Sequence, residues 1–364
     1  MSVHEFFDLF LEELRHHGKL GEYYKFHADP ARLAFRRAYF TQRLQYVFDR
    51  VMEARNRRQA PDGFSVWDAG SGYSTTQIFL ALNGVASHGS TLEYYFDHLP
   101  QRFDYWSKYG DMGLVSVSYE NIFEAPVKEN SEDIIIVQDT LHHLEPLRDS
   151  LRIFYKTLRP GGFLLAVEEN GNNILQRIKL YRQRGNKRII EFYDEGLGRK
   201  VLMGNENIRS YKTWKKELEK AGFQMDEKKL HYVRFFPPSF FKNKNINDII
   251  KKEQHLWKKY PLLKEYFFFG VDFIGVKATE SQGGNHKEKQ AGAGHPLSTS
   301  LNFFLKYTKL KAARQVVGYR NVFLLFDYFR PAGITIWYDT GSPADKNFMH
   351  VGLFCGKGVV EFWY

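Results

Sequence analysis

The spacing of apolar positions divides the chain into stretches of different period. From residue 3 to about residue 57, apolar side chains recur every three or four positions, which predicts two or three helices with a break near residues 27–30. From residue 64 to 170, short β-like runs alternate with helical stretches. These runs are FSVWDAG (64–70), STLEYYFD (90–97), GLVSVSYE (113–120), DIIIVQD (133–139) and FLLAVEEN (163–170). Such alternation predicts a parallel sheet with helices on its faces, because parallel neighbours need crossover connections.

The pattern changes again after residue 170. Residues 171–279 contain a basic helical insert (171–208), a helix ending at KAGF (220–223) and two β-like runs, MDEKKLHYVRFF (225–236) and YFFFGVDFIGVKAT (266–279). Residues 280–296 are polar, glycine-rich and without periodicity, which is typical of a linker.

The last stretch, residues 297–364, has enough apolar and aromatic residues to pack. It predicts a helix over residues 300–317 and a terminal hairpin in which HVGLFC (350–355) and VVEFWY (359–364) flank a GKG turn. It contains no motif with chemistry. We expect it either to dock on the main domain or to serve as a partner surface.

Composition bears on the compartment. The chain has 364 residues and one cysteine, Cys355, which excludes an intramolecular disulfide framework and favours a reducing compartment. Residues 1–17 are amphipathic and carry several acids, unlike a secretory signal. No run of about 18 uncharged apolar residues could cross a bilayer. We therefore expect a soluble, cytoplasmic protein.

The excess positive charge, +10 for the chain, is concentrated in one stretch of the sequence. Residues 173–265 hold 23 Lys and Arg against 11 Asp and Glu. This excess would steer an anionic substrate, a nucleic acid or a membrane surface, or would simply solvate helices.

A glycine-rich turn, DAGSG (68–72), follows the first β-like run. A strand followed by such a turn and a helix delivers backbone N–H groups to a ligand at the carboxyl end of a sheet. Thr75 stands where a dinucleotide fingerprint has its third glycine, and Asp68 would repel a pyrophosphate. The turn therefore favours a ligand that carries a positive charge, such as an ammonium group.

A second acid, Asp97, lies at the end of the predicted strand 90–97. An acid a little over 20 residues beyond the glycine turn is placed to accept hydrogen bonds from ribose hydroxyls. The alternative is an N-cap for the helix that follows.

The downstream half, SEDIIIVQDTLHHLEPLRDSLRIFYKTLRPGGFLLAVEEN (131–170), resembles the class I S-adenosylmethionine-dependent methyltransferases, especially their small-molecule branch. With DAGSG and Asp97, the resemblance covers residues 64–170 firmly and 171–279 more loosely. It implies an α/β, Rossmann-like fold with a seven-stranded, mostly parallel sheet, helices on both faces and one antiparallel strand near the edge. The expected organisation is a helical cap (1–60), a methyltransferase domain (61–279) with the insert 171–208 as a candidate lid, a linker (280–296) and a C-terminal segment (297–364).

The resemblance also implies where S-adenosylmethionine would bind. The methionine part would lie against Asp68, Gly70, Ser71 and Gly72, and Asp97 would hold the ribose. Glu120 and Asn121 would lie near the adenine, and Gln138 beside the methionine moiety and the substrate opening. The chain departs from the family pattern at Tyr73, which replaces a third glycine, and at Glu120, which replaces the commoner aspartate.

Methyl transfer from a sulfonium is a direct displacement, so the protein mainly has to align the reactants and exclude water. A base helps where the acceptor must lose a proton. The candidates are His142, His143 and Glu168, with Asp139 and Glu169 also at this edge; each has an alternative role in holding a loop, capping a helix or pairing with an arginine. Adjacent histidines are expected to point in different directions, so we expect one of them at most to face the pocket and no metal site.

The substrate side of the site is less defined in the sequence. Tyr23, Tyr24 and His27 would line a lid over the substrate, where aromatic rings favour a sulfonium, or would belong to the core of the helical cap.

Three classes of function remain open. The first is a methyltransferase for a small organic acceptor with an O, N or C nucleophile. The second is a methyltransferase for RNA or another anionic macromolecule. The third is a non-catalytic binding protein that keeps the fold. A nicotinamide oxidoreductase is disfavoured by Thr75 and Asp68.

Overall fold

The computed structural model describes residues 1–27, 32–58, 63–126, 128–242 and 244–279, together with four strands nearer the C-terminus. The chain divides into two compact units, residues 1–285 and 286–364. The N-terminal helices and the central sheet both fall in the first unit.

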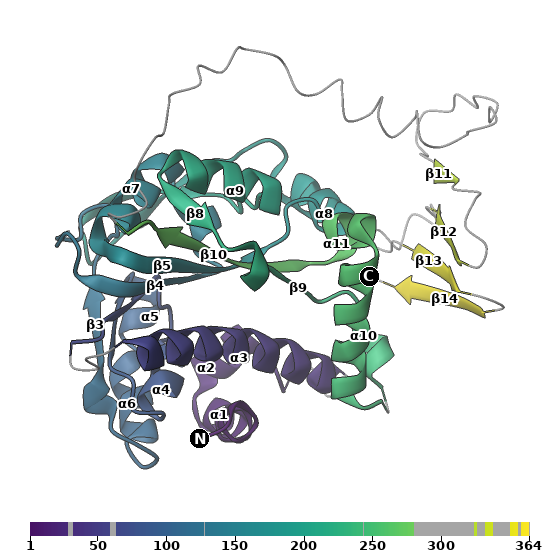
Figure 1. Cartoon of the computed structure of the whole chain (residues 1–364). Coiled ribbons are helices and arrows are strands. Elements are labelled where there is room, and N and C mark those ends of the chain that lie inside the picture. The colour runs from purple at the N-terminus through teal and green to yellow at the C-terminus, as the bar shows by residue number, and fades with distance from the viewer. Residues whose placement is uncertain are drawn as a thin grey trace, which may run out of the picture. The chain divides into compact units, whose positions relative to one another are not determined.

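The first unit is built on a sheet with the strand order β3-β2-β1-β4-β5-β10-β8, in which β9 also pairs with β10 (Figure 1). Strands β1 to β5 are parallel, β10 is antiparallel to β5, and β8 and β9 are antiparallel to β10. Their bounds are β1 Val66–Ala69, β2 Ser87–Thr91, β3 Val115–Tyr119, β4 Glu132–Gln138, β5 Leu158–Glu169, β8 Phe223–Met225, β9 His231–Val233 and β10 Gly270–Lys277. The predicted mostly parallel, Rossmann-like sheet is confirmed.

Both faces of this sheet are buried. In β4, Ile134 and Ile136 pack toward α3, whereas Ile135 and Val137 pack toward α7 and α9. A strand buried on both faces has a continuous apolar sequence, which explains why DIIIVQD was recognisable as a strand. Figure 1 shows α3 along one face and α7 and α9 over the other.

The helices of the first unit are α1 Val3–His16, α2 Gly18–Tyr24, α3 Leu33–Arg57, α4 Thr75–Ala81, α5 Glu93–Phe96, α6 Leu99–Trp106, α7 Leu147–Thr157, α8 Ile174–Arg184, α9 Tyr211–Lys220, α10 Ile246–Lys259 and α11 Pro261–Phe267. Two or three helices were predicted before residue 57, and the structure has three, although residues 28–31 lie outside the described part. Ser2 and Glu5 form a capping box that starts α1. The buried rings of α1 then pack against Phe79 and Trp106. Among the described residues, no helix is both long and apolar enough to span a membrane.

Three local predictions were wrong. The second strand is SHGST (87–91), and residues 93–96 of the predicted strand 90–97 form α5. The insert 171–208 contains α8 but continues as a hairpin of β6 Ile189–Asp194 and β7 Arg199–Gly204. The run 225–236 is interrupted by a short 3-10 helix, η4 Glu227–Lys229, and the strand β9 follows it. The sheet therefore has eight strands instead of the predicted seven, because β8 and β9 both pair with β10.

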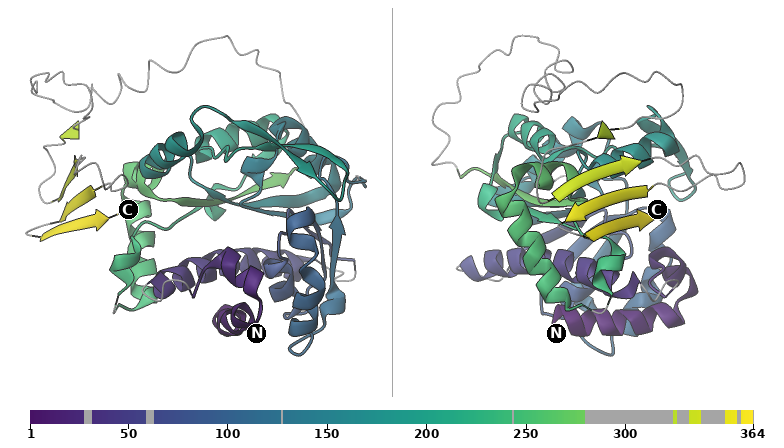
Figure 2. Two further views of the ribbon diagram at one scale, coloured as in Figure 1. Left: turned by 180° about the vertical axis from the view of Figure 1, so that it is seen from behind. Right: turned by 90° about the vertical axis from the view of Figure 1, so that its right-hand side faces the viewer.

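The second unit contains an antiparallel sheet with the order β11-β12-β13-β14. The strands are β11 Leu324–Leu325, β12 Ala332–Trp337, β13 His350–Cys355 and β14 Gly358–Trp363. The predicted terminal hairpin is confirmed as β13 and β14 (Figure 2). The expected linker 280–296 and helix 300–317 lie outside the described residues.

Candidate functional site

The glycine-rich turn links the ends of three strands. The N–H groups of Gly70 and Ser71 donate hydrogen bonds of 3.0 and 2.9 Å to the carbonyl oxygen of Ser90 in β2. Gly70 has a φ of +84°, and a Cβ there would lie 2.4 Å from Cγ2 of Thr140, beyond the end of β4. Glycine is therefore required at position 70 both by the backbone conformation and by the close approach of the neighbouring loop.

Three polar side chains at or next to this turn have no partner among the described residues. Asp68 is only 2% exposed, and burial raises the pKa of its carboxyl to about 7. Within the described part of the chain, no cationic side chain pairs with it. The hydroxyls of Ser71 and Ser74 are also buried without a hydrogen-bond partner among the described residues. A buried carboxyl and two buried hydroxyls fit the ammonium and carboxylate of an amino-acid ligand, because each would satisfy a group that is otherwise costly to bury.

The acid after β2 is not where the sequence analysis placed it. Strand β2 ends at Thr91, and Asp97 is the C-cap residue of α5. The N-cap residue of α6 is His98, so Asp97 does not fill that alternative role either. The acid nearest the strand end is Glu93, the first residue of α5, two positions after Thr91. Sequence reasoning missed Glu93 because the aromatic residues around it were taken as part of the strand.

The residues after β3 lie at the same sheet edge. The N–H of Glu120 donates to the carbonyl oxygen of Thr91 at 3.1 Å, which ties the ends of β3 and β2 together. The side-chain oxygen of Asn121 accepts from the N–H of Phe123 at 3.2 Å. Glu120 and Asn121 are thus held beside the end of β2.

The end of β4 is connected to the glycine turn and to α3. Gln138 donates from Nε2 to Oγ1 of Thr76, in the first turn of α4, at 2.5 Å. Asp139, which is 46% exposed, forms a 2.6 Å ion pair with Arg43 of α3. The structure therefore brings Gln138 to the helix that follows the glycine turn and engages Asp139 with the helical cap.

His142 and His143 lie in a short 3-10 helix, η3 Leu141–His143, beyond β4. His142 is 3% exposed, and its Nδ1 lies 2.5 Å from Oε2 of Glu168 at the end of β5. Burial disfavours the charged imidazole, but the carboxylate of Glu168 raises the pKa of His142 to about 9. The other oxygen of Glu168 accepts from the N–H of Leu141 at 2.8 Å. Both oxygens of Glu168 are therefore occupied in orienting η3.

The expectation that the two histidines point apart was wrong. Their ring centroids are 4.2 Å apart, and both Nε2 atoms lie near the carboxylate of Glu206, at 3.7 Å for His142 and 3.8 Å for His143. The 3-10 backbone turns the two rings to the same side, and the loop after β7 brings Glu206 to them. Sequence reasoning missed Glu206 because it is 63 positions beyond His143, in the insert.

Glu169 has a different partner from its neighbour Glu168. It forms a 3.1 Å ion pair with Arg234, whose guanidinium lies over the ring of Tyr39, 4.6 Å from its centroid. Burial raises the pKa of Glu169 in spite of this pair. Glu169 thus pairs with an arginine, but the alternative interpretation expected an arginine of the insert 171–208, whereas Arg234 follows β9.

The insert hairpin covers this edge of the sheet. The hydroxyl of Tyr119, at the end of β3, donates to the carboxylate of Asp194 in β6, and Arg199 in β7 pairs with Glu124. The carbonyl oxygen of Gly204 lies 2.9 Å from Nδ1 of His143. The hairpin therefore contacts the loops after both β3 and β4.

The helical cap supplies aromatic rings to the glycine turn. The rings of Tyr23 and Tyr24 lie 5.1 and 6.3 Å from that of Tyr73, measured between centroids. His27 does not join them; its Nε2 lies 2.9 Å from the carbonyl oxygen of Leu11 in α1. Two of the three predicted lid residues thus reach the turn.

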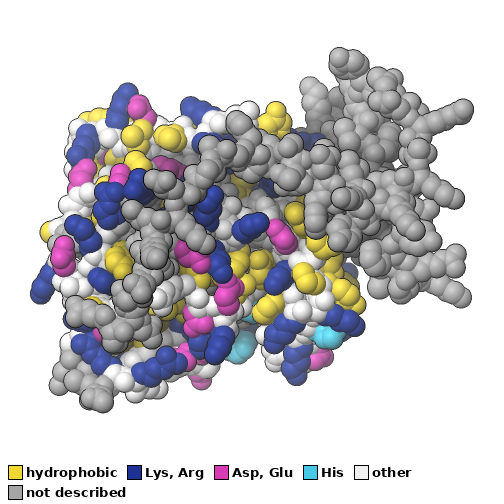
Figure 3. All heavy atoms as spheres, turned by 45° about the horizontal axis from the view of Figure 1, so that its top comes forward, with side chains coloured by type: hydrophobic (Ala, Val, Ile, Leu, Met, Phe, Trp, Pro, Cys, Tyr) yellow, Lys and Arg dark blue, Asp and Glu magenta, His cyan; other side chains and the backbone are white. Residues whose placement is uncertain are grey.

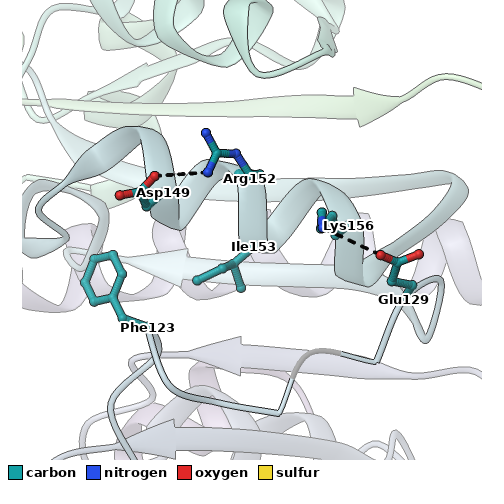
Figure 4. A pocket seen from close by; sticks show the side chains of 6 residues that line it. All are labelled: Phe123, Glu129, Asp149, Arg152, Ile153 and Lys156. Carbon is teal, nitrogen blue, oxygen red and sulfur yellow. Dashed lines mark hydrogen bonds and ion pairs between the residues drawn. The ribbon is translucent and has the colours of Figure 1, made fainter.

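Two surface depressions lie away from this edge. One, of about 520 Å³, lies against the outer side of α7 and is lined by Phe123, Glu129, Asp149, Arg152, Ile153 and Lys156 (Figure 4). Its charged residues pair with one another, Asp149 with Arg152 and Lys156 with Glu129. The other, of about 360 Å³, lies between residues 16–20 and 98–102. Neither contains a residue of the glycine turn, so the candidate functional site remains at the carboxyl edge of the sheet.

Comparison with known proteins agrees with this geometry. Residues 67–166 match the family model described as a methyltransferase domain, which agrees with the resemblance to the class I S-adenosylmethionine-dependent methyltransferases. A stretch of 118 residues is 31% identical to a highly reducing polyketide synthase of Strobilurus tenacellus. That match covers 32% of this chain and only 4% of the length of the synthase.

Parts of the chain also match solved structures at low sequence identity. A structure described as a putative S-adenosylmethionine-dependent methyltransferase from Listeria monocytogenes is 15% identical, with 65% of this chain and 98% of that chain covered and a TM-score of 0.41. A structure described as a putative sarcosine dimethylglycine methyltransferase from Galdieria sulphuraria is 14% identical, with 67% and 88% covered and a TM-score of 0.43. The cofactor that the methyltransferase domain implies is S-adenosylmethionine.

Proposed function

We propose that this chain transfers a methyl group from S-adenosylmethionine to a small organic acceptor. The observation that carries the proposal is Asp68, a buried carboxyl with a raised pKa at the carboxyl edge of a parallel sheet, next to a turn that only glycine can make. An ammonium group of the cofactor would supply the missing counter-charge. The cofactor, when bound, supplies an electrophilic methyl group on a sulfonium.

The residues at the edge divide the binding tasks. Asp68 accepts hydrogen bonds from the ammonium group, and the hydroxyls of Ser71 and Ser74 donate to the carboxylate. We assign the ribose to Glu93, the acid that follows the end of β2 most closely in the sequence, with Asp97 as the alternative. Glu120 and Asn121 would lie near the adenine, and Gln138 beside the methionine moiety and the substrate opening.

Alignment and water exclusion then account for catalysis, because a direct displacement needs no nucleophile from the protein. The rings of Tyr23 and Tyr73 lie beside the turn, where they would favour a sulfonium by cation–π attraction. The insert hairpin lies over the edge and would limit the access of water. We assign His142 to the substrate side of the site, with Glu168 as its positioning residue.

A small acceptor is favoured over a nucleic acid. Seven of the 23 Lys and Arg between residues 173 and 265 form ion pairs with described residues, among them Arg199 with Glu124, Lys215 with Glu227 and Lys229 with Glu53. Figure 3 shows Lys and Arg interspersed with acidic and hydrophobic side chains on the face that includes α7 and α9. A continuous basic stripe, which tracking a phosphate backbone requires, is not seen on the described part of that face.

Calorimetric titration with S-adenosylmethionine and S-adenosylhomocysteine tests the proposal. Wild-type protein is compared with Glu93→Ala and with Asp97→Ala as the matched control. We expect micromolar binding, a loss of about 10-fold or more in Glu93→Ala, since a hydrogen bond to a charged group contributes about 1.5–3 kcal/mol, and little change in Asp97→Ala. The reverse order would return the ribose role to Asp97. Absence of binding by folded wild-type protein would reject the enzyme and leave the non-catalytic binding protein.

The acceptor class is tested separately with labelled methyl donor. Incorporation into small molecules of a cell extract, unaffected by removing RNA with nuclease, is the expected result. Incorporation that disappears with the nuclease, or falls steeply with salt, would favour the macromolecular acceptor.

A further inference from the structure

Three side chains from two separate segments converge on one point. They are His142 and His143 of η3 and Glu206 from the loop after β7. One ligand atom from each, an imidazole nitrogen or a carboxylate oxygen, lies within 4.8 Å of the other two. The Nε2 atoms of the two histidines are 3.7 and 3.8 Å from the two oxygens of Glu206, which is too long for a hydrogen bond.

The remote nitrogen of each ring is already fixed. Nδ1 of His142 is held by the carboxylate of Glu168 at 2.5 Å, and Nδ1 of His143 by the carbonyl oxygen of Gly204 at 2.9 Å. In metal sites, a ligating histidine donates its other ring N–H to a carboxylate or a backbone carbonyl, which sets the tautomer and directs the free nitrogen at the ion. Both histidines have such a partner here, one of each kind.

The backbone around Glu206 is built to hold it at this place. Glu206 has a φ of +54°, an uncommon conformation for a residue with a side chain. The N–H of the next residue, Asn207, donates to the carbonyl oxygen of His142 at 3.1 Å, and a Cβ on Gly204 would lie 2.5 Å from that same oxygen. The loop is thus docked directly on η3, with a conformation that carries Glu206 to the two imidazoles.

We propose that His142, His143 and Glu206 bind a divalent transition-metal ion of the zinc type. Two imidazoles and one carboxylate suit Zn²⁺ or a neighbouring first-row ion and do not suit Mg²⁺ or Ca²⁺, which prefer oxygen ligands. Zn²⁺ takes nitrogen and oxygen ligands at about 2.0–2.2 Å, so the three ligand atoms, which lie within 4.8 Å of one another, would have to close in around the ion.

Such a site would keep a coordination position open. Three protein ligands leave a tetrahedral ion one position short. Glu206 is 43% exposed and His143 29% exposed, so that position is within reach of solvent. If the proposed methyl transfer holds, an acceptor with an anionic or hydroxyl oxygen would be the ligand that fills it. The ion would also join η3 to the insert hairpin, fastening the hairpin over the sheet edge.

Metal titration of the full-length, chelator-treated protein tests the site. Co²⁺ is titrated and followed by its visible d–d absorption, and Zn²⁺ by calorimetry, in wild type, His143→Ala, Glu206→Gln and Glu168→Gln. His255→Ala, an exposed histidine on α10, is the matched control. We expect one ion per chain with a Co²⁺ spectrum of low coordination number, and unchanged binding in the control.

The variants separate ligands from orienting groups. Loss of a ligand in His143→Ala or Glu206→Gln should weaken binding by more than about 100-fold, and Glu168→Gln by about 10–100-fold. Glu206→Gln keeps the size of an exposed side chain, so it remains informative if a histidine variant fails to fold. Wild-type protein that binds no ion, or Glu206→Gln and His143→Ala that bind as tightly as wild type, would overturn the proposal and leave the three groups as ion pairs only. Cofactor titration of the same samples distinguishes that result from failure of the proposed function.

Discussion

The hydroxyl of Tyr119, the last residue of β3, donates a hydrogen bond to the buried carboxylate of Asp194 in β6, 75 positions further along the chain. The same carboxylate oxygen accepts from the N–H of Leu197 at 2.9 Å. A Cβ on Gly196 would lie 2.5 Å from the Tyr119 hydroxyl, so the turn of the hairpin is closed tightly over that ring. This contact fixes the insert hairpin to the edge of the sheet at which the cofactor residues lie.

Tyr119→Phe should loosen the hairpin. It leaves a buried carboxylate with one hydrogen bond fewer, which costs about 1–3 kcal/mol. We expect faster hydrogen exchange in residues 189–204 and weaker cofactor binding, with the central strands unchanged. Tyr193→Phe, in the same hairpin but 61% exposed, is the control and should behave as wild type. Equal exchange rates in both variants would show that the hydroxyl does not hold the hairpin.

A buried ion pair joins the helical cap to the glycine turn. Arg102 of α6 makes two 2.7 Å contacts with the carboxylate of Glu13 in α1, and both side chains are completely buried. A further nitrogen of Arg102 donates to the carbonyl oxygen of Tyr73 and to Oγ1 of Thr75. Arg102→Met would leave Glu13 buried and unpaired, and should lower the free energy of unfolding by about 3–5 kcal/mol.

Chemical denaturation of two further variants completes this test. Glu13→Leu combined with Arg102→Met should recover most of the stability, because no charge is then stranded. Cofactor affinity should stay low in the double variant, since the Tyr73 carbonyl still lacks its donor. Arg152→Met, which breaks the exposed pair with Asp149, should cost at most about 1 kcal/mol. A double variant no more stable than Arg102→Met would contradict this account.

Gly70→Ala should be more damaging than the same change at Gly84. Both glycines have positive φ, +84° and +71°, so alanine costs about 1–2 kcal/mol at either position. Only at Gly70 does the added methyl group meet a neighbour, Cγ2 of Thr140 at 2.4 Å, whereas nothing lies within 4 Å at Gly84. Thermal melts of the two variants measure the difference. Equal losses would mean that the loop after β4 yields to the methyl group.

The sequence predicted the elements whose burial is uniform. Strands β1, β4 and β5 lie in the middle of a parallel sheet, so their residues are apolar on both faces and stand out from the flanking polar turns. Strand β2 did not stand out because it reads SHGST. Gly89 has no room for a side chain, since Oε1 of Gln77 and Oγ of Ser71 would lie 2.4 and 2.7 Å from a Cβ. Packing by neighbours selects small residues there, against β-propensity, while the aromatic run after it forms a helix.

The parts of the site that depend on distant partners could not be predicted. The turn DAGSG and the sheet edge were predicted from local pattern. The pairing of Arg102 with Glu13 joins residues 89 positions apart, and that of His142 with Glu206 joins residues 64 positions apart. Neither pair leaves a periodic signal. A single charged residue on a helix or a loop looks the same in the sequence whether it is exposed to solvent or paired with a distant residue.

Asp68 should make the stability of the cofactor-free protein depend on pH. Its pKa is about 7 in the folded chain and about 4 in an unfolded one, so the folded state holds an extra proton between these values. The contribution of Asp68 to the free energy of unfolding is therefore complete below about pH 4. The free energy of unfolding then falls by up to about 4 kcal/mol as the pH rises to about 7. Asp68→Asn keeps the shape without the titration. Wild type and variant should be equally stable near pH 4, and the variant more stable at pH 8, in denaturation curves measured over that range.

The cofactor should make wild type the more stable of the two at pH 8, because its ammonium group pairs with the ionised carboxylate. Binding of the cofactor by wild type should therefore tighten from pH 5 to 8. Stability curves that run parallel for the two proteins, or cofactor binding that ignores the substitution, would show that Asp68 is not the group that meets the ammonium.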